Sequence, residues 1–353
     1  MRDVAYLVSH VPLSVLDTAP VSVGQSSGDA LAASTELART AEAAGYARFW
    51  VAEHHSMAAV ASTSPGVLLA HLAASTSTIR VGSGGVMLPN HPSLVVAEQF
   101  AMLEALHPGR VDLGIGRAPG ADPMTAAALR RTVDGLGADD FPAELIDVLV
   151  LLGVPVTGHA GSLRASRLSA TPAATSAPEV WLLGSSLFSA QLAGQLGLPF
   201  SYANHFNTGL TLEAAAAYRS SFRASQVLDE PHLMVSASVL VADSDEEASY
   251  LAGPSRVMAL SLRSGRPLGP IVSPSDAAAA LAEIDPVQAA EFFAKFPGTQ
   301  IATTADRAVD ELTALVGRTG ADELMITGTA FDIATRQRTI EAVAARWPAT
   351  VTA

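Results

Sequence analysis

The chain has 353 residues, of which 49% are hydrophobic and 16% charged, and its formal net charge is −13. A protein this acidic lacks the basic footprint that nucleic acid requires, and no apolar run reaches the ~20 residues needed to cross a bilayer. It has no cysteine, which excludes disulfides and thiolate chemistry, and its first ten residues do not form a signal peptide. These features predict a cytoplasmic protein with one domain over residues 1–353.

Strands and helices alternate along the chain. Four strand–helix pairs are predicted in the first half, at 13–16 with 30–44, 48–52 with 65–74, 79–82 with 92–106, and 110–115 with helical segments within 123–153. Four more are predicted in the second half, at 179–183 with 189–196, 199–203 with 212–223, 233–241 with 246–262, and 322–327 with 333–346. Eight such units in series favour a closed parallel (β/α)8 TIM barrel over a doubly wound open sheet.

Two intervals are longer than a minimal unit requires. Residues 154–178, rich in Gly, Ser, Thr and Pro, follow the fourth unit, and residues 265–304 follow the seventh. Both are predicted to be insertions. Long connections within a compact domain are usually lids or binding elements, and 265–304 is the predicted lid.

The active site of such a barrel lies at the carboxyl ends of its strands. Five consecutive strands, the second to the sixth, each place polar residues or glycines there. These are Glu53, His54 and His55 after the second strand; Gly84 and Gly85 after the third; Arg117 after the fourth; Gly184, Ser185, Ser186 and, a little later, Ser189 after the fifth; and Asn204 and His205 after the sixth. This set suits a ligand with a flat ring and a phosphate.

The residue types support that interpretation. Glycines at 84 and 85 would let the backbone approach a flat ring closely, and the guanidinium of Arg117 is a forked donor for phosphate. Ser185, Ser186 and Ser189 lie at a helix start, where free N–H groups favour an anion. Taken singly, the glycines are also compatible with a turn and the serines with a helix cap.

The residues Glu53, His54 and His55 have three interpretations: a metal site, structural histidines, or catalysis. No HExxH spacing is present and no nearby residues complete a ligand set, so a metal is not predicted. Catalysis is favoured, because histidine exchanges protons near neutral pH. His91 and His107 each precede a proline and are interpreted as structural.

Several motifs, in order, resemble those of the bacterial luciferase-like flavin monooxygenases, in particular the small single-chain members. The likeness runs from Leu13 to Arg346, and its most specific parts are FWVAEHH (49–55), IRVGSGGVMLPNHPSLVVAEQFAMLEALHPGRVDLGIGRAPG (79–120), WLLGSSLFSAQLAGQLGLPFSYANHF (181–206) and ADELMIT (321–327). Residues 1–10 extend beyond the usual start of this family.

The resemblance implies a barrel that uses reduced FMN, supplied by a separate flavin reductase, and O2 to oxygenate a small organic substrate through a C4a-hydroperoxyflavin. His54 matches the catalytic histidine of the family, with Glu53 and His55 in support. Gly84 and Gly85 match the pair that lies under the flavin ring and is joined by a non-prolyl cis peptide bond. Arg117, Ser186 and Ser189 match positions that bind the phosphate.

Two alternatives stay open: a hydride-transfer enzyme that uses a deazaflavin on the same fold, and a flavin-binding protein without turnover. The combination of EHH at 53–55 and GIGR at 114–117 favours FMN. Gly116 stands where luciferases carry a reactive cysteine, so nothing that depends on that thiol carries over. Family members pair through the helices at 65–74 and 92–106, which predicts a homodimer.

Overall fold

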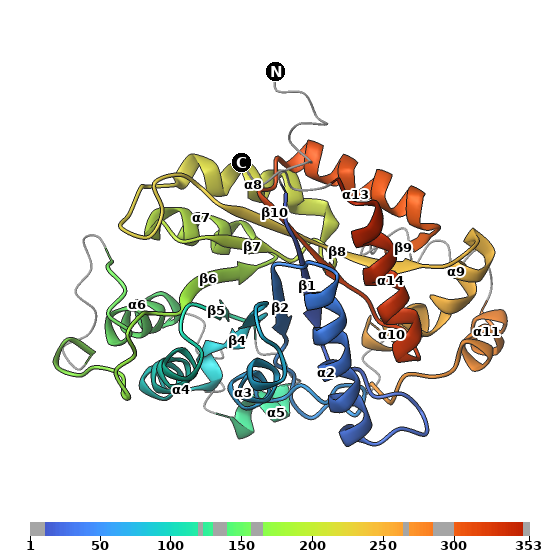
Figure 1. Cartoon of the computed structure of the whole chain (residues 1–353), viewed down its shortest axis with the longest axis horizontal. Helices are drawn as coiled ribbons and strands as arrows, with labels where there is room; N and C mark the ends of the chain where they lie inside the picture. The colour runs from blue at the N-terminus through green and yellow to red at the C-terminus, as the bar shows by residue number, and fades with distance from the viewer. Residues whose placement is uncertain are drawn as a thin grey trace.

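The computed structural model describes residues 11–118, 123–129, 140–156, 165–263, 268–284 and 300–348 (Figure 1). Within these residues eight parallel strands form a closed ring, in the order β1 (Leu13–Asp17), β2 (Arg48–Val51), β3 (Arg80–Ser83), β5 (Val111–Gly116), β6 (Glu179–Gly184), β7 (Phe200–Tyr202), β8 (Leu233–Val241) and β10 (Glu323–Thr327). The ring closes because β10 pairs with both β1 and β8. The predicted (β/α)8 barrel is confirmed.

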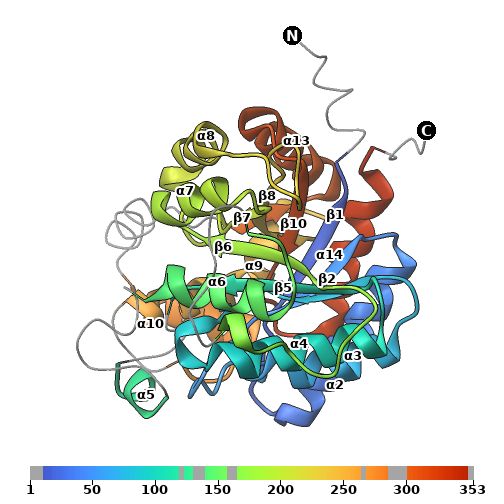
Figure 2. The ribbon, with the colours of Figure 1, turned by 90° about the vertical axis from the view of Figure 1, so that its left-hand side faces the viewer.

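Helices surround the ring on its outer side (Figures 1 and 2). They are α2 (Ser27–Ala43), α3 (Pro65–Ser75), α4 (Ser93–Leu106), α5 (Pro123–Ala128), α6 (Phe141–Leu151), α7 (Leu187–Leu196), α8 (Thr211–Ser221), α9 (Asp245–Leu251), α10 (Gly253–Arg263), α11 (Pro274–Ala282), α13 (Ala305–Thr319) and α14 (Ile333–Arg346). Among the described residues, no helix is both long and apolar enough to span a bilayer.

Successive side chains of a strand point to opposite faces of the barrel wall, so the apolar residues form two cores. One set faces the helices and includes Phe49, Val81 and Leu113, all fully buried. The other fills the centre of the barrel, where Trp50 and Trp181 pack edge to face with ring centroids 5.4 Å apart. The barrel is therefore a packed body, and a ligand can enter only at its ends.

A network of charged side chains fills the amino end of the barrel. Arg48 Nη1 lies 2.9 Å from Asp112 Oδ1, and its Nε lies 3.0 Å from Glu323 Oε1. Arg80 Nε donates to the same Asp112 oxygen at 2.8 Å, and Glu179 contacts both arginines. Because each buried charge has an opposite partner, this end is sealed without an unpaired ion.

Some elements differ from the sequence prediction. Helix α2 begins at Ser27 because Ser26 and Asp29 form a capping box there. The predicted helix at 246–262 is two helices, since Pro254 lacks the N–H that would continue α9 into α10.

The predicted lid at 265–304 contains α11 and the strand β9 (Gln300–Thr303), which pairs with the second half of β8. Residues 264–267 and 285–299 of this region lie outside the described residues, as does the extension at 1–10.

Four further short elements occur among the described residues: the strand β4 (Val86–Met87) and the 3-10 turns η1 (Leu88–Asn90), η2 (Ala165–Arg167) and η3 (Thr208–Leu210). The chain also returns to its beginning. Trp347, just after α14, donates from Nε1 to the carbonyl of Val11 at 2.9 Å. The two described ends therefore meet at the amino end of the barrel.

Candidate functional site at the carboxyl end of the barrel

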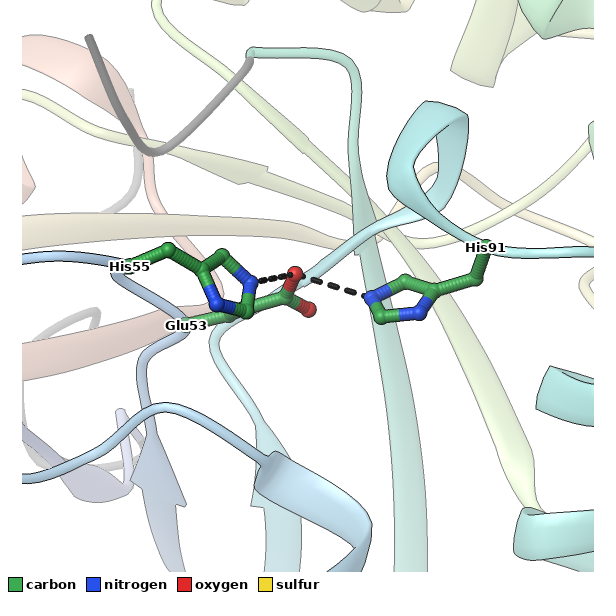
Figure 3. Close-up of side chains that lie close together, drawn as sticks. All are labelled: Glu53, His55 and His91. Atoms are coloured by element: carbon green, nitrogen blue, oxygen red, sulfur yellow. Dashed lines mark hydrogen bonds and ion pairs between the residues drawn. The ribbon is translucent and has the colours of Figure 1, made fainter. Parts of the chain in front are cut away.

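The carboxylate of Glu53, just beyond β2, organises the first part of the site (Figure 3). The residue is fully buried, and its Oε1 lies 2.8 Å from His55 Nε2, 2.8 Å from His91 Nε2 and 3.0 Å from Asn90 Nδ2. Its Oε2 accepts the backbone N–H of Met87 at 3.0 Å. Burial alone would raise the pKa of Glu53, but the bonds from His91, His55 and Asn90 outweigh it and lower that pKa.

Protonation states follow from this arrangement. A carboxylate with a lowered pKa is an acceptor only, so each imidazole presents an N–H to it from Nε2. Glu53, His55 and His91 also have ligand atoms within 4.8 Å of one another, the spacing of a metal site. However, a hydrogen atom on each Nε2 accounts for the short contacts of His55 and His91 with Glu53. A metal ion would instead need a lone pair on each of these nitrogens. The hydrogen-bonded interpretation explains the geometry.

His91 is the member of this cluster that the sequence analysis interpreted as structural. It lies in the turn between η1 and α4, 38 residues after Glu53. Only the closure of β2 against β3 brings the two together, and no spacing signal in the sequence marks the pair.

Among the described residues, the side chain of His54 takes no part in the hydrogen bonds around Glu53. Its backbone N–H donates to the carbonyl of Ser62 at 3.1 Å, while its Nδ1 is buried and has no partner among the residues that the structure describes. Burial lowers the pKa of His54; Glu53 opposes this shift and His55 adds to it. A neutral histidine with an unpartnered buried nitrogen leaves a position for a group that the protein does not supply.

Gly84 and Gly85 are joined by a non-prolyl cis peptide bond, as the resemblance implies. A Cβ added at Gly84 would lie 2.5 Å from Leu16 Cδ1, and one at Gly85 would lie 2.8 Å from the carbonyl oxygen of Gly114. The contact at Gly85 is with backbone, which cannot move aside, whereas the contact at Gly84 is with the end of a flexible side chain. Packing against the protein is thus one reason for a glycine at 85, and the close approach of a ligand to both glycines stays a prediction.

Arg117 and the start of α7 come together from two different strands. The guanidinium carbon of Arg117 lies 4.4 Å from the centre of the Phe188 ring, in the first turn of α7. Ser186 caps that helix, and its Oγ accepts the N–H of Ser189 at 3.4 Å. Gly184 leaves room for this turn, because an added Cβ would lie 2.4 Å from Ser189 Oγ. A cation beside a helix N-terminus is a favourable position for phosphate.

Two predicted residues are engaged by the protein. The carbonyl of Ser185 accepts from Asn207 Nδ2 at 3.1 Å, which fixes the chain before α7. Asn204 donates from Nδ2 to the carbonyl of Ser236 at 3.0 Å, and its Oδ1 accepts from Thr211 Oγ1 at 2.6 Å. Asn204 thus joins β7 to β8 and α8.

The structure adds His205, which the sequence analysis noted after β7 without giving it a role. Its Nδ1 lies 2.6 Å from Ser236 Oγ. Burial, and secondarily the nearby His54, lowers the pKa of His205 to about 4. Two histidines therefore follow barrel strands at the carboxyl end, His54 after β2 and His205 after β7.

Comparison with known proteins places this geometry in context. The profile of the luciferase-like monooxygenases matches residues 11–347. A luciferase-like monooxygenase of Escherichia coli is 40% identical over 343 residues, covering 94% of this chain and 95% of the relative. The crystal structure of apo-MsnO8 has 35% identity and a TM-score of 0.85, over 95% and 98% of the two chains.

A more distant structure contains a flavin. The oxygenating constituent of 3,6-diketocamphane monooxygenase from Pseudomonas putida, in complex with FMN, has 21% identity and a TM-score of 0.71, over 97% of this chain and 99% of that one. At this identity the likeness shows the fold alone.

Proposed function

The chain belongs to the luciferase-like monooxygenase family and is an oxidoreductase of that kind, and from this premise we propose that it uses reduced FMN and O2 to oxygenate a small organic substrate. The observation that carries the choice of FMN is the meeting of Arg117 with the Ser186-capped start of α7. A flavin mononucleotide ends in a phosphate, and a cation beside a helix N-terminus supports binding of that group here.

The residues present fit the group in two respects. The groups that would hold the phosphate are Arg117, the hydroxyls of Ser186 and Ser189, and backbone N–H groups at the start of α7. The unpartnered Nδ1 of His54 and the backbone at Gly84–Gly85 would face the ring. When bound, reduced FMN supplies the electrons that activate O2.

The side chains have separate tasks in this proposal. His54 is neutral at pH 7, because its pKa is lowered, and it holds or accepts a proton at Nδ1 beside the reacting groups. Glu53 fixes His55 and His91 and so orients the chain on both sides of His54. Buried Leu16 and Trp50 close the barrel beneath the site and keep water out.

Two partners complete the proposal. A separate flavin reductase supplies the reduced FMN, and a second copy of the chain covers α3 and α4. Helix α4 carries exposed apolar residues at helical spacing, with Val95 42%, Met102 53% and Leu106 62% exposed. Val67 on α3 is 73% exposed. These side chains suit a two-fold interface.

Anaerobic titration with reduced FMN tests the proposal. Arg117→Ala should weaken binding by about 1.5–3 kcal/mol, the contribution of a charge-assisted contact, whereas His54→Ala should bind nearly as the parent does. Arg346→Ala, a substitution in an exposed ion pair of α14, is the control. Equal losses in Arg117→Ala and His54→Ala would contradict these roles. Selective binding of a reduced deazaflavin would instead indicate the hydride-transfer alternative.

A further inference from the structure

Phe188 is a large apolar side chain that lies at the surface. It belongs to the first turn of α7, two residues after the capping Ser186, and 39% of it is exposed. The next two residues of the helix, Ser189 and Ala190, are buried, so they attach this turn to the barrel. The ring of Phe188 can therefore contact a group outside the core.

The ring contacts the guanidinium of Arg117. The guanidinium carbon lies over the ring, 4.4 Å from its centre, which is well within the ~6 Å at which an aromatic face attracts a cation. Arg117 follows β5 and Phe188 follows β6, and these two strands pair in parallel. The contact therefore connects two neighbouring loops at the carboxyl end of the barrel.

Hydrogen bonds hold the segment that carries the ring. Ser186 Oγ accepts the N–H of Ser189 at 3.4 Å, and the carbonyl of Ser185 accepts from Asn207 Nδ2 at 3.1 Å. The backbone at the start of α7 is thus fixed from within the helix and from the chain after β7. A ring mounted on this segment keeps the guanidinium beside the helix N-terminus, where an anion is favoured.

A guanidinium can contact a ring and a phosphate at the same time. Its N–H groups lie in its own plane, so a contact through its face leaves these donors for a second partner. The arginine side chain also has ~2 kcal/mol of rotamer entropy to lose when it is ordered. A ring that orders Arg117 before the ligand arrives reduces this cost of binding.

We propose that Phe188 is a positioning residue, whose ring holds the guanidinium of Arg117 beside the start of α7 and so sets the preference of the site for FMN over riboflavin. Riboflavin lacks the phosphate that Arg117 would bind, so its affinity does not depend on the ring. This inference rests on the proposed function and adds a residue that determines which flavin the same site selects.

Two other roles for Phe188 give different results. If the ring held the guanidinium away from the ligand, removing the ring would tighten the binding of FMN. If the ring only packed α7 against the barrel, removing it would change the affinities for FMN and riboflavin by the same factor.

Anaerobic titration of the full chain with reduced FMN and, separately, with reduced riboflavin distinguishes these roles. Phe188→Leu should weaken FMN binding roughly two- to fivefold, which corresponds to about 0.5–1 kcal/mol for an exposed cation–π contact, and should leave riboflavin binding unchanged. Phe188→Tyr, which keeps the ring, should restore the affinity for FMN. In an Arg117→Ala background, Phe188→Leu should have no further effect, because the ring acts through the guanidinium.

Phe206→Leu is the matched control, because it replaces another exposed phenyl ring, 61% exposed, in the chain after β7. It should leave the ratio of the two affinities unchanged. An unchanged ratio in Phe188→Leu, tighter FMN binding, or an equal loss in the Arg117→Ala background would overturn the proposal.

Inorganic phosphate is a probe that does not require the flavin ring. Nitrogen-15 NMR should show a shift of the Arg117 Nε signal when phosphate is added, with a dissociation constant two- to fivefold higher in Phe188→Leu. If the parent binds phosphate in this way but not reduced FMN, the proposed function fails and the role of Phe188 stands. If FMN binds equally well to the parent and to Phe188→Leu, the role of Phe188 fails and the proposed function stands. A parent that binds neither ligand would overturn both.

Discussion

A single carboxylate determines the arrangement of the chain around His54. Four donors converge on Glu53, and two of them belong to histidines that are far apart in sequence. The residue is fully buried, so its carboxylate relies on these donors in place of water. Side chains with this many contacts are sensitive even to isosteric change.

Glu53→Gln should therefore destabilise the protein by about 1–3 kcal/mol, since the amide turns an N–H2 group toward groups that themselves donate. The measurement is the free energy of unfolding in denaturant. Glu98→Gln is the matched control, because Glu98 lies at the surface, where it accepts from Thr171 Oγ1 at 2.9 Å. An equal loss in both variants would contradict the importance given to the cluster.

At this scale the sequence predicts residue types better than contacts. Glu53, His54 and Arg117 were identified because each follows a strand, which is a local feature. His91 and His205 are not assigned to the site from sequence, because their partners lie 38 and 31 residues away and meet them only when neighbouring strands pair. The packing reason for the glycine at 85 is also inaccessible from sequence, since it depends on Gly114.

At the level of whole elements, ion pairs connect the amino ends of neighbouring strands. Asp112 of β5 binds Arg48 of β2 and Arg80 of β3, and its Oδ2 accepts Trp50 Nε1 at 2.9 Å. Its side chain is completely buried. Removing it would leave two guanidinium groups with fewer partners inside the barrel.

Asp112→Ala should cost about 3–5 kcal/mol, because breaking a buried pair leaves an uncompensated charge. Asp306→Ala is the comparison, since Asp306 pairs with Arg346 at 2.6 Å but its side chain is 83% exposed. That change should cost about 1 kcal/mol or less. Urea unfolding of both variants gives the comparison, and similar losses would show that burial of the network does not matter.

The pattern of elements was predictable where hydrophobic periodicity is strong. All eight barrel strands were predicted, because a strand buried on both faces reads as a short apolar run between turn residues. The two-residue β4 is too short to show a period, and β9 and α11 lie in the segment predicted to be a lid. Pro254 is a sequence signal for the break between α9 and α10. The helical pattern of the flanking residues continues across it, which is why a single helix is predicted there.

For the whole molecule, three of the groups with a lowered pKa illustrate how stability depends on pH. The pKa values of His205 and His54 are lowered, mainly by burial. Backbone N–H groups of Ser77, Thr78 and Ile79 outweigh burial and lower the pKa of Glu42 to about 2. Each group binds protons more readily in the unfolded chain, so its contribution to stability is present at high pH and lost on acidification.

The free energy of unfolding should therefore fall as the pH drops from about 6.5 to about 4, by up to about 3 kcal/mol from His205. Denaturant unfolding at a series of pH values measures this. His205→Asn should flatten the curve in that window while leaving the acid limb due to Glu42. A curve of unchanged slope in this variant would contradict the assignment.

The proposed dimer is also a property of the whole molecule. Light scattering at micromolar concentration should give the mass of two chains. Met102→Glu on α4 should give one, because it places a charge within the apolar interface. Val23→Glu is the control: Val23 is 52% exposed, close to the 53% of Met102, and lies outside α3 and α4. A monomeric parent would refute the dimer.

The bond between Trp347 and Val11 has a practical consequence for the connectivity of the chain. The described ends lie side by side at the end of the barrel opposite the site, so a short peptide could join them into a circle. The barrel could then be reopened at another surface loop, and its order of synthesis changed, while the carboxyl ends of the strands keep their neighbours.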